Sequence, residues 1–109
     1  MPAYAVGIIH VPQLNDAIRS YLERIDATLA PFGGRFLIHG GGPYRCLEGD
    51  PGADLIVIEF ADMDRAARWY DSAAYQAIKP LRTGHSAGTV FLADGVPPGY
   101  RATEILDHA

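Results

Sequence analysis

The sequence predicts an α+β fold whose elements follow the order β-α-β-β-α-β. Two observations carry this prediction. Apolar residues recur with a period of two in some segments and of three to four in others, and the two kinds of segment alternate along the chain. Glycine and proline clusters separate the segments. This order is typical of the split βαβ arrangement, in which both helices cover one face of an antiparallel sheet.

The first third of the chain predicts a strand followed by a helix. The run from Tyr4 to Val11 is rich in β-branched residues, and Pro12 ends it. The next apolar residues recur at three- and four-residue steps, which predicts that they share one helix face. They are Leu14, Ile18, Tyr21, Leu22, Ile25 and Leu29. Pro31 and Gly33–Gly34 end this helix.

Two strands flank a long central loop. Arg35–Gly40 is the predicted second strand, and Leu55–Phe60 is the third. The segment between them, residues 43–53, is rich in turn-forming residues.

A broken helix and a last strand complete the predicted domain. Asp62 is suited to cap a helix over Met63–Asp71, and Ser72 begins a second helical piece that leads to Pro80. The last strand is predicted over Thr89–Ala93. We therefore expect one domain over residues 1–95 and a separate C-terminal tail over residues 96–109.

Composition excludes several classes of function. The chain has 109 residues, a net charge of −4 and scattered basic residues, so nucleic-acid binding is not expected. Cys46 is the only cysteine, which rules out an internal disulfide. No stretch has the length of a membrane span or the pattern of a signal peptide, so a cytoplasmic protein is expected. The four histidines show no ligand spacing, and neither a metal nor another cofactor is predicted.

Strand alternation predicts a homodimer. In the third strand, one face carries Ile56, Ile58 and Phe60, and the other carries Leu55, Val57 and Glu59. In the second strand, Phe36 and Ile38 oppose Arg35, Leu37 and His39. We expect the all-apolar set to lie under the helices. The other face would then expose leucine and valine to water, which indicates that two sheets meet face to face.

Several stretches together resemble the domain of unknown function 1330 family. They are GGRFLIHGG (33–41), EGD (48–50), IVIEF (56–60), WYDSAAYQAIKPLR (69–82) and LADG (92–95). The resemblance implies a ferredoxin-like fold of the dimeric α/β barrel superfamily. Relatives there include cofactor-free monooxygenases, isomerases, haem enzymes and ligand-sensing modules. Members often have Arg at the position of His39, and the tail from Val96 lies outside the shared pattern.

Three polar residues are the candidate catalytic group. Arg35, His39 and Glu59 are expected on one sheet face, and His10 joins them if Val6 and Ile8 face the same way. Imidazole beside a carboxylate suits proton transfer, and arginine suits a carboxylate or enolate oxygen. The alternative is a buried Arg–Glu pair that fixes the dimer without any ligand.

The aromatic residues after the third strand are candidate substrate contacts. Trp69, Tyr70 and Tyr75 lie on or just after the second helix. Arg82 is a weaker candidate at the mouth of the last strand, where a solvated loop is the default. Aromatic residues at such positions more often pack in the core, although their polar ends need partners when buried.

Three functional hypotheses remain open at this stage. The first is a cofactor-free enzyme that moves a proton on a small organic acid or phenol, with Glu59 or His39 as base and Arg35 holding the oxyanion. The second is a binding or sensing module with the same pocket. The third is a structural dimer without a ligand.

Overall fold

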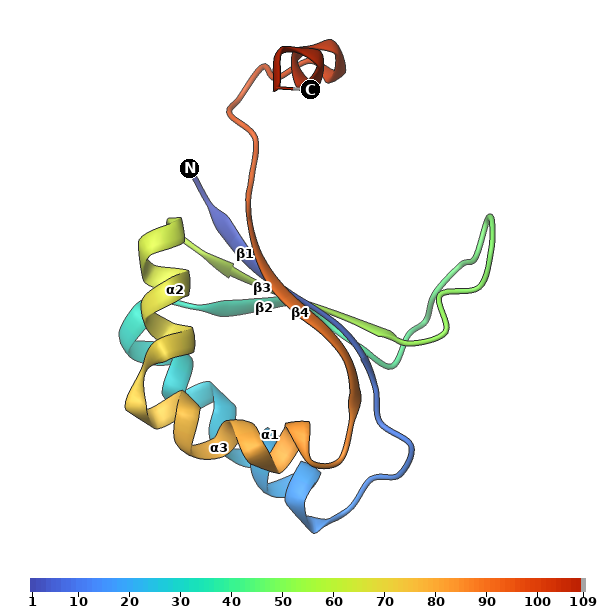
Figure 1. Cartoon of the computed structure of the whole chain (residues 1–109), viewed down its shortest axis with the longest axis vertical. Helices are drawn as coiled ribbons and strands as arrows, with labels where there is room; N and C mark the ends of the chain where they lie inside the picture. The colour runs from blue at the N-terminus through green and yellow to red at the C-terminus, as the bar shows by residue number, and fades with distance from the viewer. Residues whose placement is uncertain (109) are drawn as a thin grey trace.

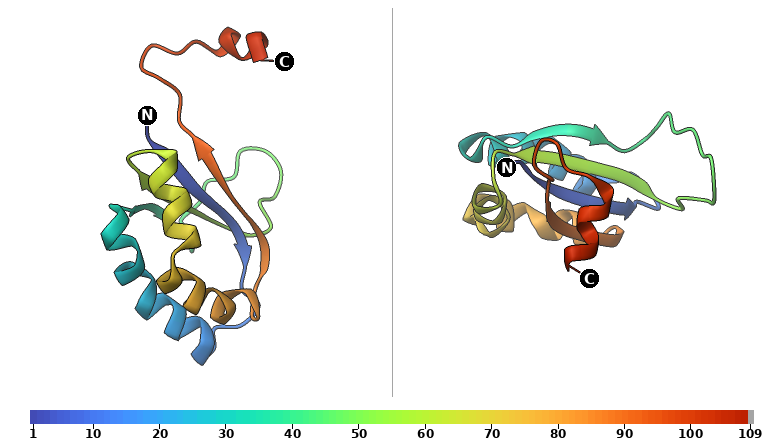
Figure 2. Two further views of the ribbon diagram at one scale, coloured as in Figure 1. Left: turned by 60° about the vertical axis from the view of Figure 1, so that its left-hand side comes forward. Right: turned by 90° about the horizontal axis from the view of Figure 1, so that it is seen from above.

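The protein consists of a four-stranded antiparallel sheet with helices on one face (Figures 1 and 2). The computed structural model describes residues 1–108. The strands are β1 (Ala3–His10), β2 (Arg35–His39), β3 (Asp54–Phe60) and β4 (Ala87–Asp94). The helices are α1 (Asp16–Leu29), α2 (Met63–Asp71) and α3 (Ala73–Thr83), with 3₁₀ turns η1 (Ala30–Phe32) and η2 (Ala102–His108).

The strand order β2-β3-β1-β4, with every neighbouring pair antiparallel, is that of a ferredoxin-like fold. The predicted fold class is therefore confirmed. The central strands β1 and β3 pair from Ala3 to Ile9, so the core is built over them.

Side-chain caps set the helix boundaries. The Asn15 side chain accepts a hydrogen bond from the Ile18 backbone N–H, so α1 begins at Asp16. Leu14, which the periodicity placed on the helix face, therefore lies before the helix and is 58% exposed. Ser72 ends α2 and caps α3 through the Tyr75 backbone N–H. The second piece continues through Pro80 as a full helix.

A bulge in β2 changes which of its side chains lie under the helices. Phe36 pairs with Ile58, but the next pairs are Ile38 with Val57 and His39 with Ile56. The shift adds one residue to β2, which reverses the alternation beyond it. The expectation that Ile38 lies under the helices is wrong, because it falls on the open face and is 42% exposed.

Helices and sheet enclose an aromatic core. Phe60 from β3 contacts Trp69 from α2, with ring centroids 5.5 Å apart, and Trp69 in turn contacts Tyr75 from α3 at 4.3 Å. All three side chains are at most 2% exposed. Aromatic burial of this kind is a large part of the driving force for packing two layers together.

The tail leaves the sheet after Asp94 and projects away from the body of the molecule (Figures 1 and 2). Ile105 and Leu106 of η2 are 63% and 69% exposed. The radius of gyration is 15.4 Å, whereas a compact chain of this length has about 13 Å. The projecting tail accounts for the direction of this difference.

Within residues 1–108, no helix is both long enough and apolar enough to cross a membrane.

At Gly88 the backbone of β4 approaches the backbone of β1 closely. The φ angle of Gly88 is +153°, and a Cβ atom there would overlap the carbonyl oxygen of Ile8 and approach the Ile9 Cα within 2.9 Å. Only glycine meets both requirements without a shift of the strands.

Gly88→Ala is therefore expected to lower the free energy of unfolding by roughly 3 kcal/mol or more, measured by urea denaturation. Gly41→Ala is the matched control, because Gly41 also has a positive φ (+70°) but has open space around its Cα. It is expected to cost only about 1–2 kcal/mol. Equal losses in the two variants would contradict the close approach of the strands.

Candidate functional site

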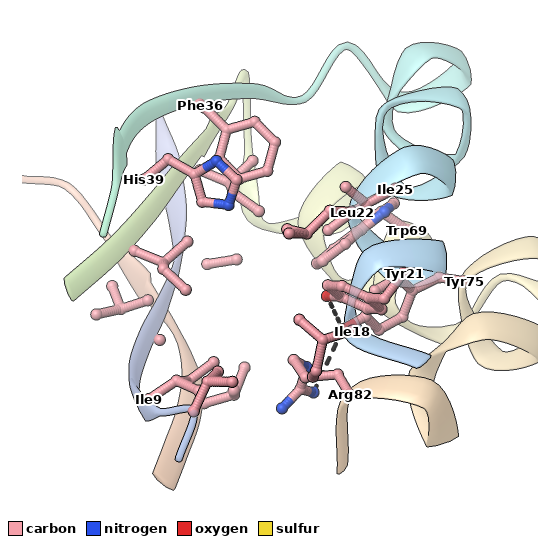
Figure 3. A pocket seen from close by; sticks show the side chains of 17 residues that line it. Ile9, Ile18, Tyr21, Leu22, Ile25, Phe36, His39, Trp69, Tyr75 and Arg82 are labelled. Atoms are coloured by element: carbon pink, nitrogen blue, oxygen red, sulfur yellow. Dashed lines mark hydrogen bonds between the residues drawn. The ribbon is translucent and has the colours of Figure 1, made fainter. Parts of the chain in front are cut away.

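An apolar cavity of about 90 Å³ lies between the helices and the sheet (Figure 3). Its sheet wall comes from all four strands, with β4 contributing Val90, and its helix wall comes from α1, α2 and α3. Most lining side chains are aliphatic or aromatic. The polar groups are few, as is usual for small-molecule sites, and they come from both walls.

The helix wall carries two tyrosines and an arginine. Tyr75 and Arg82 are seven residues apart on α3, which places them on one helix face two turns apart. Tyr21 lies on the buried face of α1 together with Ile18 and Ile25. The packing of α1 against α3 brings the three polar side chains together (Figure 3).

Hydrogen bonds join these three side chains. The two hydroxyl oxygens of Tyr21 and Tyr75 are 2.9 Å apart, and the Arg82 guanidinium donates to the Tyr75 hydroxyl at 3.4 Å. The Arg82 Cζ atom also lies 5.8 Å from the centre of the Tyr21 ring, within the range of a cation–π contact. We call Tyr21, Tyr75 and Arg82 the phenol–arginine cluster.

Burial governs the titration of the cluster. Burial raises the pKa of the Tyr21 hydroxyl well above its usual range, the nearby Tyr75 raises it further, and Arg82 lowers it in part. For Arg82, burial alone acts to lower the pKa, but the adjacent Tyr75 and Tyr21 phenols outweigh it and the pKa rises. The cluster therefore keeps a protonated Tyr21 phenol beside a guanidinium cation.

Trp69 lines the cavity, and its indole N–H already has a hydrogen-bond acceptor within the protein. Its indole N–H donates to the Thr28 hydroxyl at 3.0 Å, and that hydroxyl donates to the Ile25 carbonyl at 2.7 Å. This chain of hydrogen bonds satisfies the indole without a ligand. Trp69 thus contributes shape to the cavity and no free donor.

His39 lies on the sheet side of the cavity, across from the phenol–arginine cluster (Figure 3). Its ring stacks on Phe36 with centroids 4.3 Å apart and planes inclined by 23°. The residue is exposed, and within residues 1–108 no hydrogen bond joins its ring nitrogens to another residue. The imidazole is therefore available at the edge of the cavity.

Arg35 and Glu59 lie on the opposite face of the sheet. They face each other across β2 and β3, and the Arg35 Nη2 atom is 2.7 Å from Glu59 Oε1. The expectation that His39 shares this face is wrong, because the bulge turns His39 toward the helices. No His–carboxylate pair forms between them. The Arg35 side chain is 70% exposed, so this ion pair adds little stability to the fold.

Two other predicted site residues lie apart from the cavity. His10 does fall on the open sheet face, as do Val6 and Ile8, but it is six residues along β1 from Tyr4, the partner of Glu59. Six residues of strand span about 20 Å, so His10 does not join the Arg35–Glu59 pair. Tyr70 packs beneath the ammonium group of Lys79, whose Nζ atom is 5.2 Å from the centre of the Tyr70 ring.

The sequence reasoning found Tyr75, Arg82 and Trp69 but missed Tyr21 as a polar site residue. Its position among the apolar residues of α1 marked it as a core side chain, and it is indeed only 8% exposed. A buried phenol needs a hydrogen-bond partner, and this need was the available indication. Within residues 1–108, no three His, Cys, Asp or Glu side chains gather closely enough to hold a metal ion.

The fold and the cavity together define a class: a two-layer ferredoxin-like α+β protein with an apolar pocket between its helices and its sheet. Residues 2–96 match the model of the domain of unknown function 1330 (DUF1330) family. The chain therefore belongs to the DUF1330 family.

Solved structures share this fold at low sequence identity. SnoaB, a cofactor-independent oxygenase from Streptomyces nogalater, is similar with 17% identity and a TM-score of 0.59, over 92% of this chain and 98% of SnoaB. A dimeric ferredoxin-like protein of unknown function from Jannaschia has 16% identity and a TM-score of 0.58, over 89% of this chain and 100% of that protein.

RPA0582 of Rhodopseudomonas palustris, also of unknown function, has 11% identity and a TM-score of 0.64, over 89% of this chain and 84% of that protein. Among curated protein sequences, none matches this chain significantly. At these identities the structural likeness establishes the fold and leaves the activity open.

The raised pKa of Tyr21 predicts a loss of stability in alkali. The ordinary pKa of a tyrosine is about 10. Above this pH the unfolded chain gives up the Tyr21 proton, while the folded chain keeps it. The unfolded state then binds fewer protons, so the free energy of unfolding falls as the pH rises, by up to about 1.4 kcal/mol per pH unit.

Urea denaturation between pH 8 and 11 measures this slope. Tyr21→Phe is expected to lose stability less steeply above pH 10 than the wild type, whatever its stability at neutral pH. Tyr100→Phe, which changes a tyrosine of the tail, should keep the wild-type slope. The burial argument is wrong if Tyr21→Phe keeps it as well.

Proposed function

We propose that the protein binds a small, largely apolar molecule with an acidic or phenolic oxygen in the cavity between its layers, and transfers a proton on it without a cofactor. The observation that carries this proposal is the placement of a free imidazole and a phenol–arginine cluster on opposite walls of one apolar cavity. Apolar walls bind the body of a ligand, and a few convergent polar groups orient it.

His39 is the proton-accepting group in this proposal. Its imidazole lines the cavity, and within residues 1–108 its nitrogens are free of hydrogen bonds to other residues. Imidazole can take a proton from a bound molecule and return it to another atom of the same molecule. Glu59 and Arg35, first considered for such roles, point to the other side of the sheet and are left out of the cavity chemistry.

The relation to SnoaB supports the cofactor-free part of the proposal. That protein is described as a cofactor-independent oxygenase and has a ferredoxin-like chain of nearly the same extent. The fold is thus compatible with chemistry that needs no cofactor.

A thermal-shift screen of small carboxylic acids, phenols and lactones tests the binding. A ligand at about 100 times its Kd stabilises by roughly 2.7 kcal/mol, which raises Tm by several degrees for a domain of this size. Wild type is expected to respond to members of these classes. If no compound in the panel raises Tm, the proposal is contradicted.

Two histidine variants test the role of His39. His39→Gln is expected to reduce turnover of any hit that is a substrate by at least 100-fold while Tm changes little, because the side chain lies at the edge of the cavity. His10→Gln is the matched control, since His10 is also an exposed strand histidine but lies on the other sheet face. Equal effects of the two changes would exclude His39 as the proton acceptor.

We further propose that two copies associate through the open sheet face. The support is a group of apolar side chains on this face, each more than two-fifths exposed: Ile8, Leu37, Ile38 and Phe91. Contiguous apolar surface of this kind is rare on a monomer. The Jannaschia protein of the same fold is described as dimeric.

Light scattering at micromolar concentration is expected to give the mass of a dimer. Phe91→Lys, which places a charge on the open face, should shift the mass to that of a monomer because an unpaired charge at a buried interface is costly. Leu14→Lys changes an exposed apolar residue outside the sheet and should leave the dimer intact. A monomeric wild type would refute the association.

A further inference from the structure

The two buried phenols of the phenol–arginine cluster hold one more proton than their contacts use. Each hydroxyl has a single proton to donate. One of the two protons forms the bond between Tyr21 and Tyr75. The only other contact to these hydroxyls in residues 1–108 comes from Arg82, which is itself a donor. One phenol proton therefore has no acceptor in the described chain.

This count does not depend on the direction of the Tyr21–Tyr75 bond. If Tyr75 donates to Tyr21, the Tyr21 proton is free, and if Tyr21 donates to Tyr75, the Tyr75 proton is free. Tyr21 is 8% exposed and Tyr75 is 2% exposed, so bulk water has little access to either hydroxyl. Both side chains line the cavity, and the cavity is where an acceptor can approach them.

Arg82 adds further donors at the same place. A guanidinium has five N–H groups, and within residues 1–108 one side-chain hydrogen bond, to Tyr75, engages this one. Its head lies beside the cavity, next to Tyr21 and Ile18 (Figure 3). The remaining polar group of the helix wall, the Trp69 indole, is occupied by Thr28. The helix wall thus offers a phenol O–H and a cation to one approaching oxygen.

We propose that the phenol–arginine cluster is an oxyanion-binding site, and that the ligand is an enolisable carbonyl compound or a phenol whose oxygen binds there. This inference rests on the proposed function, since it names the ligand class of the same cavity. The preorganised donors stabilise negative charge that develops on the oxygen. The high pKa of Tyr21 is consistent with a group that donates its hydrogen and stays protonated.

The site implies one balanced reaction for a carbonyl ligand. A C–H bond next to the carbonyl breaks, and its proton moves to the His39 imidazole. The electron pair shifts through the new C=C bond to the oxygen, which becomes an enolate held by the phenol and Arg82. His39 then returns the proton to the oxygen or, where the ligand has a second C=C bond conjugated with the enolate, to the far carbon of that conjugated system. The result is an isomer of the substrate, and no further reactant is needed.

The binding of 4-nitrophenol and 4-nitroanisole distinguishes the oxyanion site from simple apolar binding. The two probes have nearly the same shape, but only 4-nitrophenol ionises, and its anion is coloured. The absorbance of the bound probe, titrated against pH, reports how strongly the protein favours the anion. Tyr21→Phe, Tyr75→Phe and Arg82→Gln are measured beside the controls Tyr70→Phe and Arg19→Gln, which change residues outside the cavity.

The wild type is expected to bind the nitrophenolate anion at least tenfold more tightly than 4-nitroanisole. Loss of a donor in Tyr21→Phe, Tyr75→Phe or Arg82→Gln should weaken anion binding roughly tenfold or more, because hydrogen bonds to a charged group are strong, and should change 4-nitroanisole binding less than threefold. The controls should match the wild type. Arg82→Gln changes a half-buried residue in the last turn of α3, so it remains informative if a tyrosine variant fails to fold.

Two results would overturn the inference. One of them leaves the proposed function standing, and the other overturns it as well. If both probes bind but the bound nitrophenol ionises as it does in water, the oxyanion site is wrong and the proposed binding function stands. If neither probe binds, while the folded wild type also fails to respond to the acids, phenols and lactones, the proposed function fails together with the oxyanion site.

Discussion

The hydrogen bond between the buried hydroxyls of Tyr21 and Tyr75 is the contact on which the arrangement of the helix layer depends. It joins α1 to α3 at a point where neither hydroxyl has ready access to water, so each is the other's necessary partner. Helices that slid past each other by a few ångströms would break this bond and leave the buried Tyr21 hydroxyl unpaired. The same constraint holds Arg82 beside the phenols, because Arg82 stands two turns from Tyr75 on α3. The packing of the layer and the polar wall of the cavity therefore have one cause.

On the sheet side, a single extra residue in β2 decides what the cavity contains. With regular alternation, His39 would point away from the helices together with Arg35, and the sheet wall of the cavity would be entirely apolar. The bulge turns His39 inward and leaves Arg35 outside, paired with Glu59. The imidazole and the carboxylate, which a regular strand would have placed on one face, are thus separated by the thickness of the sheet. Bulges are frequent next to functional sites because they redirect one side chain at small cost to the ladder.

The fold could be predicted from the sequence because it depends on many residues that agree. The alternation in β1 and β3, the α1 periodicity and the caps Asp62 and Ser72 all indicate the same order of elements. The site, in contrast, depends on individual features, a bulge and a long-range contact, that no repeating pattern of residues indicates. A bulge has no distinct sequence pattern in a short strand such as RFLIH. The polar role of Tyr21 depends on its contact with a residue 54 positions away in the chain, which the local sequence does not indicate. Tyr75 and Arg82 were both candidates, but their shared helix face was not predicted, because the second helical piece was expected to lead only to Pro80 and it continues to Thr83.

The projecting tail has a consequence for how the molecule moves through solution. The Cα atoms extend over 46 × 35 × 23 Å, so the molecule is about twice as long as it is thick. An elongated particle meets more friction than a sphere of equal mass and samples a larger volume as it tumbles. A single copy of this chain will therefore leave a sizing column early and relax slowly in fluorescence anisotropy, in the direction that mimics an assembly. Its hydrodynamic radius therefore reports the reach of residues 96–108 as well as the number of chains.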